Sequence, residues 1–404
     1  MTTLERVSLV KCPSTSGDCD VVTRTIEAIE QTGNYAEQLS SARRIAIKIN
    51  AGVHRLILTD GKQTEITEPA VVEGAVQAIR RVTDAPIVIG DATTGGGSTE
   101  LYAALGLPER LAKYSDVRLV DFNESSLVEV PMTHAGSMFQ SYVLPRELAE
   151  ADAFVSIAKM KAHVSLGCTL CIKNLFGWMP TSVYGIPRMY LHDRLIRLPR
   201  VLVDLAAWMR PCLNVVDGIV AANKSEWNGS PMRPGVILAG TNCVAVDSVG
   251  ARVMGFDPNG DYPDHPYFYR RNAIKLAAQM GLGPNHEDQI EILGPSPEGL
   301  CDPFKVERYE GETNRDEQLR RGANCVEAYR GQQADLARKY ENRYLALFDG
   351  QVLWDGPDMA AMQQLEKESG RDWQSAPQFV VKCLPPEQEI EQMDWYRREA
   401  EATA

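Results

Sequence analysis

The feature of this sequence that most constrains its fold is an apolar segment that runs directly into a glycine-rich turn. Residues 85–91 read APIVIGD, residues 92–99 read ATTGGGST, and a helical pattern begins at Glu100. A continuous apolar run bounded by turn residues is typical of a strand buried on both faces of a parallel sheet. Loops that follow such strands bind ligands at the carboxyl ends of the strands. The segment predicts an α/β fold, although the loop matches neither the dinucleotide nor the P-loop pattern.

The same order of strand and helix recurs along the chain. Residues 44–50 read RIAIKIN with isoleucine at every second position, and a helical pattern follows to Val82, with Thr67 as its predicted N-cap and Pro69 in its first turn. Further apolar runs lie at residues 7–10, 117–122, 154–158, 212–220, 235–239 and 290–293. Strands that alternate with helices predict mostly parallel sheets flanked by helices. We predict a two-lobed core, with α/β lobes at residues 1–150 and 151–300.

The amino-acid composition changes after Gly294, where a connector rich in proline, glycine and glutamate begins. A charged helical stretch follows at residues 315–340. An Asp349-Gly350 pair between two apolar runs is a hairpin signal. We therefore predict a small C-terminal α+β module at residues 315–404.

The net charge of the chain limits which binding partners are expected. The 404-residue chain has a formal net charge of −12, which argues against nucleic acid and anionic lipid and favours a small-molecule partner. The N-terminus has no basic segment followed by an apolar stretch, and no apolar run is long enough for a membrane helix. We expect a cytoplasmic protein with no membrane partner, and homo-oligomerisation stays open. Its nine cysteines are scattered and odd in number, unlike a disulfide framework.

The densest group of reactive side chains lies in residues 159–180, KMKAHVSLGCTLCIKNLFGWMP. Lysines bind carboxylates or phosphates as point charges, and histidine is the side chain that titrates near neutrality without help. We predict Lys161, His163 and Lys173 as catalytic residues. Further predicted substrate-binding residues lie beside apolar strand runs, in the glycine-rich loop, in residues 159–180 and in the YLHDRL segment; they are Lys48, Asn50, Asp91, Thr94, Gly95, Gly96, Asn174, His192, Asp217 and Asp247. Charged residues at strand ends also pair with each other structurally, which is the alternative for each of them.

Cys168 and Cys171 form a single CxxC pair. Such a pair can be a redox couple, half of a zinc site or part of an iron–sulfur site. A structural metal normally needs two more ligands, and no second CxxC follows, so two packed thiols are the favoured interpretation. No cofactor is predicted, and a metal ion or iron–sulfur cluster at these cysteines is the alternative.

Several motifs together resemble domain of unknown function family 362 over about residues 5–294. They are Lys48-x-Asn50, Thr67-x-Pro69, the loop after Asp91, KMKAH with a downstream KNLFG, the His192 region, Val216-Asp217-Gly218, Ala245-Val246-Asp247 and residues 254–258. The resemblance implies no assigned reaction. Some members of that family carry a ferredoxin-like iron–sulfur domain, whose cysteine run this sequence lacks. Residues 325–386 resemble a short module of other uncharacterised bacterial proteins. The early layout is also similar to that of nickel-pincer lactate racemases.

These observations predict an enzyme that acts on a small anionic metabolite by proton transfer in an interlobe cleft. In this hypothesis Lys161 and Lys173 bind the anion, His163 moves the proton, and amides of the glycine-rich loop stabilise negative charge. Isomerisation, elimination or cyclisation fits these groups, so an isomerase or a lyase is favoured. The alternatives are a metal or iron–sulfur redox protein using Cys168 and Cys171, racemase chemistry of the nickel-pincer kind, and a non-catalytic ligand-binding protein.

Overall fold

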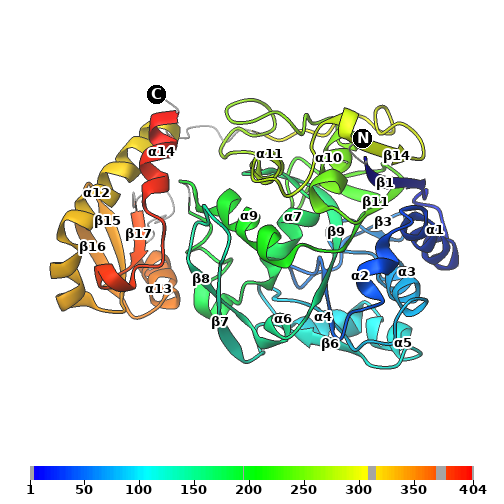
Figure 1. Cartoon of the computed structure of the whole chain (residues 1–404), viewed down its shortest axis with the longest axis horizontal. Helices are drawn as coiled ribbons and strands as arrows, with labels where there is room; N and C mark the ends of the chain where they lie inside the picture. The colour runs from blue at the N-terminus through cyan, green and yellow to red at the C-terminus, as the bar shows by residue number, and fades with distance from the viewer. Residues whose placement is uncertain (1–3, 194, 308–314, 370–378, 403–404) are drawn as a thin grey trace. The chain divides into compact units, whose positions relative to one another are not determined.

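The structure is a computed structural model that describes residues 4–193, 195–307, 315–369 and 379–402 (Figure 1). The chain divides into two compact units. Unit 1 comprises Met1–Val128, Leu144–Trp178 and Leu205–Arg308, and unit 2 comprises Glu129–Val143, Met179–Asp204 and Tyr309–Ala404. Among the described residues, no helix is both long and apolar enough to cross a membrane.

Unit 1 is built on a ten-stranded sheet whose main path has the order β14-β1-β13-β11-β9-β2-β5-β6. In this path β13 runs antiparallel to both of its neighbours, and the other adjacent pairs are parallel. The remaining two strands, β10 and β12, pair antiparallel with β9 and β11 respectively. The bounds are β1 Glu5–Lys11, β2 Ile45–Ile49, β5 Ile87–Asp91, β6 Val117–Asp121, β9 Ala153–His163, β10 Gly167–Thr169, β11 Leu213–Asn223, β12 Ser230–Met232, β13 Val236–Gly240 and β14 Ile290–Leu293.

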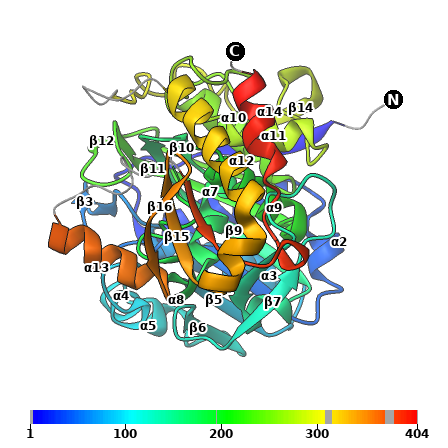
Figure 2. The ribbon, with the colours of Figure 1, turned by 90° about the vertical axis from the view of Figure 1, so that its left-hand side faces the viewer.

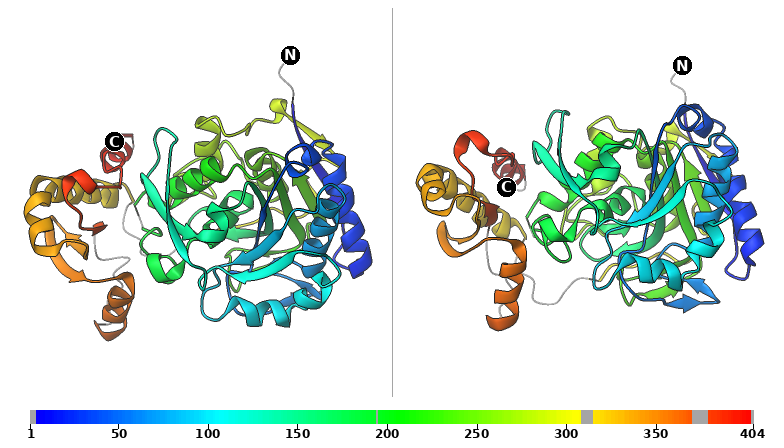
Figure 3. Two further views of the ribbon diagram at one scale, coloured as in Figure 1. Left: turned by 60° about the horizontal axis from the view of Figure 1, so that its bottom comes forward. Right: turned by 90° about the horizontal axis from the view of Figure 1, so that it is seen from below.

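The central strands are buried on both faces, as the uninterrupted apolar runs predict. Alternate residues of the strands, for example Ile45, Ile47 and Ile49, join a hydrophobic cluster with α1 and α3 on one face. Figure 3 shows α1, in dark blue, and α3, in lighter blue, along this face. The helices of unit 1 are α1 Asp18–Gln31, α2 Tyr35–Leu39, α3 Pro69–Arg80, α4 Ser98–Ala104, α5 Leu107–Leu111, α6 Arg146–Ala149, α7 Cys171–Asn174, α10 Cys243–Val253 and α11 Ala273–Gln279, with the 3₁₀ helices η1 Leu175–Trp178 and η2 Glu287–Gln289.

Unit 2 contains an antiparallel sheet of order β16-β15-β17 beside the long helix α12 (Figure 2). Its elements include α8 Thr181–Tyr184, α12 Arg315–Tyr340, β15 Tyr344–Phe348, β16 Gln351–Gly356, α13 Met359–Ser369, β17 Phe379–Lys382, η3 Pro386–Gln388 and α14 Asp394–Ala402. Asp349 and Gly350 join β15 to β16 with φ of 46° and 78°, which is the backbone of the predicted two-residue hairpin turn.

The α/β class, the large mainly parallel sheet and the small C-terminal module are confirmed. Strands from residues 1–150 and from residues 151–300 lie in the same sheet, so the two predicted lobes share it. The predicted domain boundaries themselves stay a prediction. Elements that were not predicted include the hairpin β3 Leu58–Thr59 with β4 Lys62–Gln63, and the pair β7 Leu127–Pro131 with β8 Ser141–Pro145; helix α9, Arg197–Met209, continues from unit 2 into unit 1.

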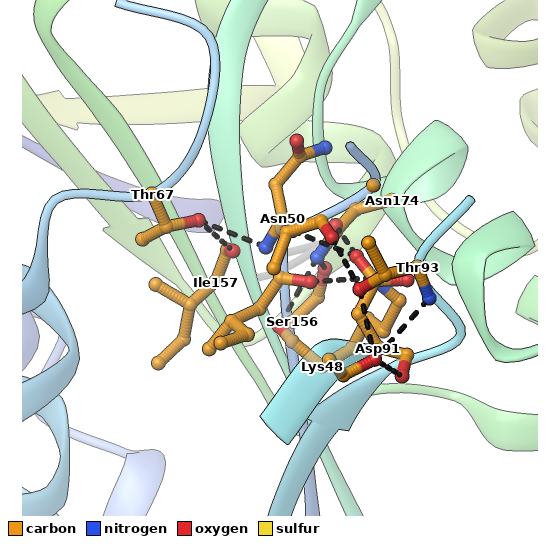
Figure 4. Close-up of polar contacts among 12 residues, drawn as sticks. Lys48, Asn50, Thr67, Asp91, Thr93, Ser156, Ile157 and Asn174 are labelled. Carbon is orange, nitrogen blue, oxygen red and sulfur yellow. Dashed lines mark hydrogen bonds and ion pairs between the residues drawn. The ribbon is translucent and has the colours of Figure 1, made fainter. Parts of the chain in front are cut away.

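One predicted cap is wrong. Glu68, not Thr67, is the N-cap residue of α3, and it makes no side-chain cap hydrogen bond. The Thr67 hydroxyl instead accepts the Asn50 N–H at 2.9 Å and donates to the Ile157 carbonyl at 3.1 Å (Figure 4). Thr67 therefore ties the end of β2 to β9, a contact that requires the two strands to be neighbours.

Candidate functional site

The site is built where β9 runs past the end of its neighbour β2. Ile49, the last residue of β2, lies opposite Ile157, and β9 continues to His163. Its pairing with β11 shifts between the Asp217–Lys159 pair and the Ala222–Lys161 pair. Irregularities of this kind re-aim side chains and are common beside active sites. The extension presents Lys159, Lys161 and His163 at alternate positions, hence on one face of the strand.

Below the extension, Lys48 is held in a buried polar network (Figure 4). Its Nζ lies 2.8 Å from Asp91 Oδ2 and 3.3 Å from Asn174 Oδ1. The Asn174 amide donates to the Lys48 carbonyl at 3.1 Å and to Ser156 Oγ at 3.0 Å. The Asp91 carboxylate also accepts the Ala51 N–H at 2.7 Å. The structure thus brings three of the predicted residues, Lys48, Asp91 and Asn174, into one network.

Gly177 leaves room for this network, and its replacement by alanine should destabilise the protein. A Cβ atom at Gly177 would lie 2.4 Å from Asp91 Oδ1 and 2.5 Å from Lys48 Nζ. Overpacking of this kind typically costs about 1–3 kcal/mol. Thermal unfolding measures the effect, and Gly331→Ala on α12, where a Cβ meets nothing within 4 Å, is the control expected to be neutral or stabilising. Equal melting temperatures for Gly177→Ala and the wild type would contradict this role.

Lys159 is neutralised in the same way. Its Nζ lies 2.9 Å from Asp217 Oδ2, and both side chains are fully buried. Asp217 Oδ2 also accepts the Glu68 N–H at 2.8 Å, which joins β11 to the start of α3. Asp217, predicted to bind substrate, is therefore engaged by Lys159 and by backbone. This pair fits the structural alternative for charged residues at strand ends.

Lys161 differs from the other two lysines. Lys161 is only 1% exposed, yet its Nζ donates a hydrogen bond to a neutral acceptor, Asn50 Oδ1, at 3.1 Å. The same Nζ lies 3.8 Å from the centre of a Trp227 ring. Within the described ranges, no carboxylate lies within 4 Å of this amine. Burial lowers the pKa of Lys161 to about 7; the Glu226 carboxylate opposes this shift and the Lys173 charge adds to it. The amine is therefore partly neutral at physiological pH.

His163 lies beside this amine on β9 and is also buried. Its Nδ1 accepts the Ser165 N–H at 3.2 Å, so the neutral ring carries its proton on Nε2, 3.6 Å from Glu226 Oε1. Burial holds the pKa of His163 well below its usual value, and the charges of Lys173, Lys161 and Arg270 act in the same direction. Lys173 is half-buried, with Nζ 4.6 Å from the centre of the Phe176 ring. A neutral imidazole thus sits within the field of several cations.

The glycine-rich loop closes the same edge of the sheet. Thr93 Oγ1 and Thr94 Oγ1 donate to the Ala51 and Gly52 carbonyls, each at 2.7 Å. Gly95 has a φ of +79°, which favours glycine, and a Cβ at Gly96 would lie 2.7 Å from the His54 ring. Thr94 is half-buried and both glycines are exposed. The loop is tied to the segment after β2, and its role in ligand binding stays a prediction.

Asp247 has a structural contact that the sequence did not indicate. Its two carboxylate oxygens accept the N–H groups of Cys171 and Ile172 at 2.7 and 2.8 Å, so it holds the start of α7. Burial raises the pKa of Asp247 to about 7, and these backbone hydrogen bonds oppose the shift. Asp247 therefore positions the helix that carries Lys173 and Asn174.

Cys168 and Cys171 are buried free thiols. Burial raises the pKa of both thiols well above the ordinary value, with the Asp247 charge acting in the same direction. In the part of the chain that the structure describes, no three His, Cys, Asp or Glu side chains are grouped so that they could hold a metal ion. The metal assignment of these cysteines stays a prediction.

Three residues near Lys161 were missed. Trp227 and Glu226 come from the turn between β11 and β12, and Arg55 donates to the buried Glu65 carboxylate at 2.6 Å while lying 5.9 Å from the Trp227 ring centre. A tryptophan inside the polar run NKSEWNGS was the available signal. His192 belongs to unit 2, whereas the other predicted site residues belong to unit 1.

The family follows from comparison with known proteins. The model of the family described as "Domain of unknown function (DUF362)" matches residues 45–252. This range contains residues 159–180 and both aspartates that pair with buried lysines, Asp91 and Asp217. This chain belongs to the DUF362 family. The DUF362 match covers β2 to α10, so the resemblance noted in the sequence is confirmed.

The DUF362 chain is also similar to individual proteins. It is 26% identical over 310 residues to "Thylakoid-associated protein sll1697" of Synechocystis, covering 75% of this chain and 88% of the relative. Among solved structures, the lactate racemase apoprotein of Thermoanaerobacterium thermosaccharolyticum gives a TM-score of 0.38 at 14% identity, covering 60% of this chain and 54% of that one. A Thermotoga maritima protein gives 0.32 at 12% identity, covering 53% of each chain. The chain thus spans about half of each solved structure. The cytoplasmic location of this chain stays a prediction.

Proposed function

We propose that this protein is an enzyme that binds a small metabolite bearing a carboxylate or phosphate and moves a proton on it, with Lys161 as the proton acceptor. The observation that carries the proposal is the contrast among three buried lysines. Asp91 neutralises Lys48 and Asp217 neutralises Lys159, whereas Lys161 is hydrogen-bonded to an amide oxygen. Buried charges are normally paired, and a buried lysine without a counter-charge is a common mark of a functional site.

The electrostatics support an anionic ligand. The charges of Lys161, Lys173 and Arg270 all act on His163, and Glu226 is the carboxylate that faces this histidine. An anion bound among these cations would offset their mutual repulsion. Lys173, half-buried at the end of α7, is our choice for the residue that contacts the carboxylate or phosphate.

The proposal changes the role that the sequence favoured for His163. With a pKa well below its usual value, His163 is neutral at pH 7, and Nε2 carries its proton. It is therefore a hydrogen-bond donor to the ligand or to Glu226. The Lys161 amine, whose pKa is about 7, has the proton affinity that a general base needs at neutral pH. Abstraction of a proton next to the anionic group would begin an isomerisation or an elimination.

Hydrogen–deuterium exchange tests the proposal without knowledge of the final product. The purified protein is incubated in D₂O with a panel of 2-hydroxy acids, 2-oxo acids and phosphate monoesters, and loss of carbon-bound protons is followed by ¹H NMR. We expect catalysed exchange in at least one compound, reduced about 100-fold or more in Lys161→Met, since a general base typically contributes that much.

The control is Lys113→Met, which removes a lysine with a 59% exposed side chain, paired with Glu73 far from β9 in the sequence. This variant should exchange as the wild type does. No exchange of any compound by the wild type, or full exchange by Lys161→Met, would refute the proposed function.

A further inference from the structure

We propose that the ligand of this site carries a ketone or aldehyde carbonyl, and that the Lys161 amine condenses with it to form an imine. The inference rests on the proposed function, and it specifies both the substrate class and a covalent step. It follows from the surroundings of Nζ, which contacts an amide oxygen and an indole ring, and from a histidine–glutamate pair supplied by the same strand and the same turn.

The first requirement for an imine is a neutral amine with its lone pair available. Nζ donates one hydrogen to Asn50 Oδ1 at 3.1 Å, which fixes the direction of the remaining positions on nitrogen. Lysines that form imines are activated by burial or by a neighbouring cation, and Lys161 has both, since it is 1% exposed and Lys173 lowers its pKa. Lys48 and Lys159 lack this property because each is held by a carboxylate.

The second requirement is a wall that keeps bulk water from the reacting atoms. The centre of a Trp227 ring lies 3.8 Å from Nζ, and the ring packs near Gly52, where a Cβ would be 3.4 Å from Trp227 Cη2. Trp227 itself is only half-buried and lies in a turn between two strands. The ligand is therefore expected to reach the amine by displacing this turn, not by opening the sheet.

The third requirement is a group that moves protons during dehydration. The amine nitrogen attacks the carbonyl carbon, the carbonyl π pair passes to oxygen, and the nitrogen proton is transferred to give a carbinolamine. The hydroxyl then leaves as water after accepting a proton, and the nitrogen lone pair forms the C=N bond. The Glu226 carboxylate, whose Oε1 lies 3.6 Å from His163 Nε2, can carry these protons. The overall change is amine plus carbonyl to imine plus one water.

Once the imine is formed and protonated, the Lys161 nitrogen has no lone pair left to accept the substrate proton, so the acceptor becomes the Glu226 carboxylate, whose charge acts on this amine. The imine also explains why proton abstraction is feasible here. A protonated imine withdraws electrons from the adjacent carbon far better than a carboxylate does, so an adjacent C–H becomes acidic. The anionic group of the ligand would then lie toward Lys173. A 2-oxo acid or a phosphorylated ketone or aldehyde has both features.

Trapping with borohydride tests the imine. The full-length protein is mixed with pyruvate or dihydroxyacetone phosphate, reduced with sodium borohydride, and analysed by intact mass and peptide mapping; lactate, which has no carbonyl, is the control ligand. We expect one adduct per chain, at Lys161, with the mass of the probe less one oxygen. Its yield should rise as the pH passes through about 7.

Lys161→Arg should lower the yield at least tenfold, and Lys113→Met should leave it unchanged. Peptide mapping of the wild type decides the matter even if the arginine variant does not fold. Adducts spread over exposed lysines with no excess at Lys161, or no adduct at all, would overturn the imine. Deuterium exchange without an adduct would overturn the imine alone, whereas failure of both would overturn the proposed function as well.

Discussion

Replacing Lys161 with methionine should stabilise the folded protein at pH 6 and have little effect near pH 10. The pKa of Lys161 falls from 10.5 to about 7 on folding, so its charged form is disfavoured in the folded state. At 1.36 kcal/mol per pKa unit, this shift corresponds to at most about 5 kcal/mol at pH 6. Methionine fills a similar volume and needs no proton. The lost contacts with Asn50 and Trp227 will reduce the gain.

The sign of the pH dependence follows from proton binding. Between pH 7 and 10.5 the unfolded chain keeps the Lys161 proton and the folded chain has lost it, so the stability of the wild type rises with pH by about 1.4 kcal/mol per unit from this residue. The charged groups that act on the amine are Glu226, Lys173, Glu65 and Asp91. All of them remain in the variant, so the difference between variant and wild type comes from Lys161 and from its effect on His163.

Calorimetric melting at pH 6 and pH 9.5 measures this difference. The advantage of Lys161→Met should be several degrees at the lower pH and should shrink at the higher one. The other titrating groups, including the buried cysteines, are present in both proteins, but the pKa of His163, which the Lys161 charge lowers, changes with the substitution and contributes to the difference. A variant that is less stable than the wild type at pH 6 would mean that a counter-charge stabilises the protonated Lys161 amine in the folded protein, so that its burial does not disfavour the charged form.

The same substitution two residues earlier should have the opposite effect. Lys159→Met leaves Asp217, which is 0% exposed, without its cation at 2.9 Å. Removal of one partner of a buried ion pair typically costs about 3–5 kcal/mol because the other charge stays buried. The Glu68 N–H still donates to Asp217 Oδ2, but one amide does not replace an ammonium group.

A double variant separates the lost pair from simple loss of packing. Lys159→Met combined with Asp217→Asn removes both charges, and its melting temperature should recover a large part of the loss seen in Lys159→Met alone. Additive losses in the two single variants would show that the pair contributes no coupling energy. Together the two methionine variants distinguish a lysine that stabilises the fold from one that is maintained at the expense of stability.

Much of the site follows from the sequence because parallel strands end at one edge of their sheet. Lys48 and Asn50 were placed at this edge as a strand end and were predicted to line one cleft with Lys161 and Asn174. The structure joins them in two hydrogen-bonded pairs, Lys48 with Asn174 and Lys161 with Asn50. The apolar runs also predicted most strands of the sheet. These inferences depend only on local pattern and on strand direction, which short segments encode.

Partner choice could not be predicted, because it depends on register between distant segments. Asp217 pairs with Lys159 only because β11 lies beside β9 in one particular register. Asp247 reaches α7 from a helix more than 70 residues later in the chain, as its contact with Cys171 spans 76 residues. Trp227 comes from a turn whose position over Lys161 no local pattern encodes.

The extension of β9 past β2 has a consequence for how members of this family can diverge. Lys161 and His163 are held on β9, which pairs with β10 and β11, whereas Trp227 and Glu226 come from the turn between β11 and β12 and Asn50 from the segment after β2. Insertions or substitutions in the turn that bears Trp227, or in the segment after β2, can therefore change the surroundings of the amine while it keeps its position. Relatives with different ligands would then share the strand residues and differ in these two segments.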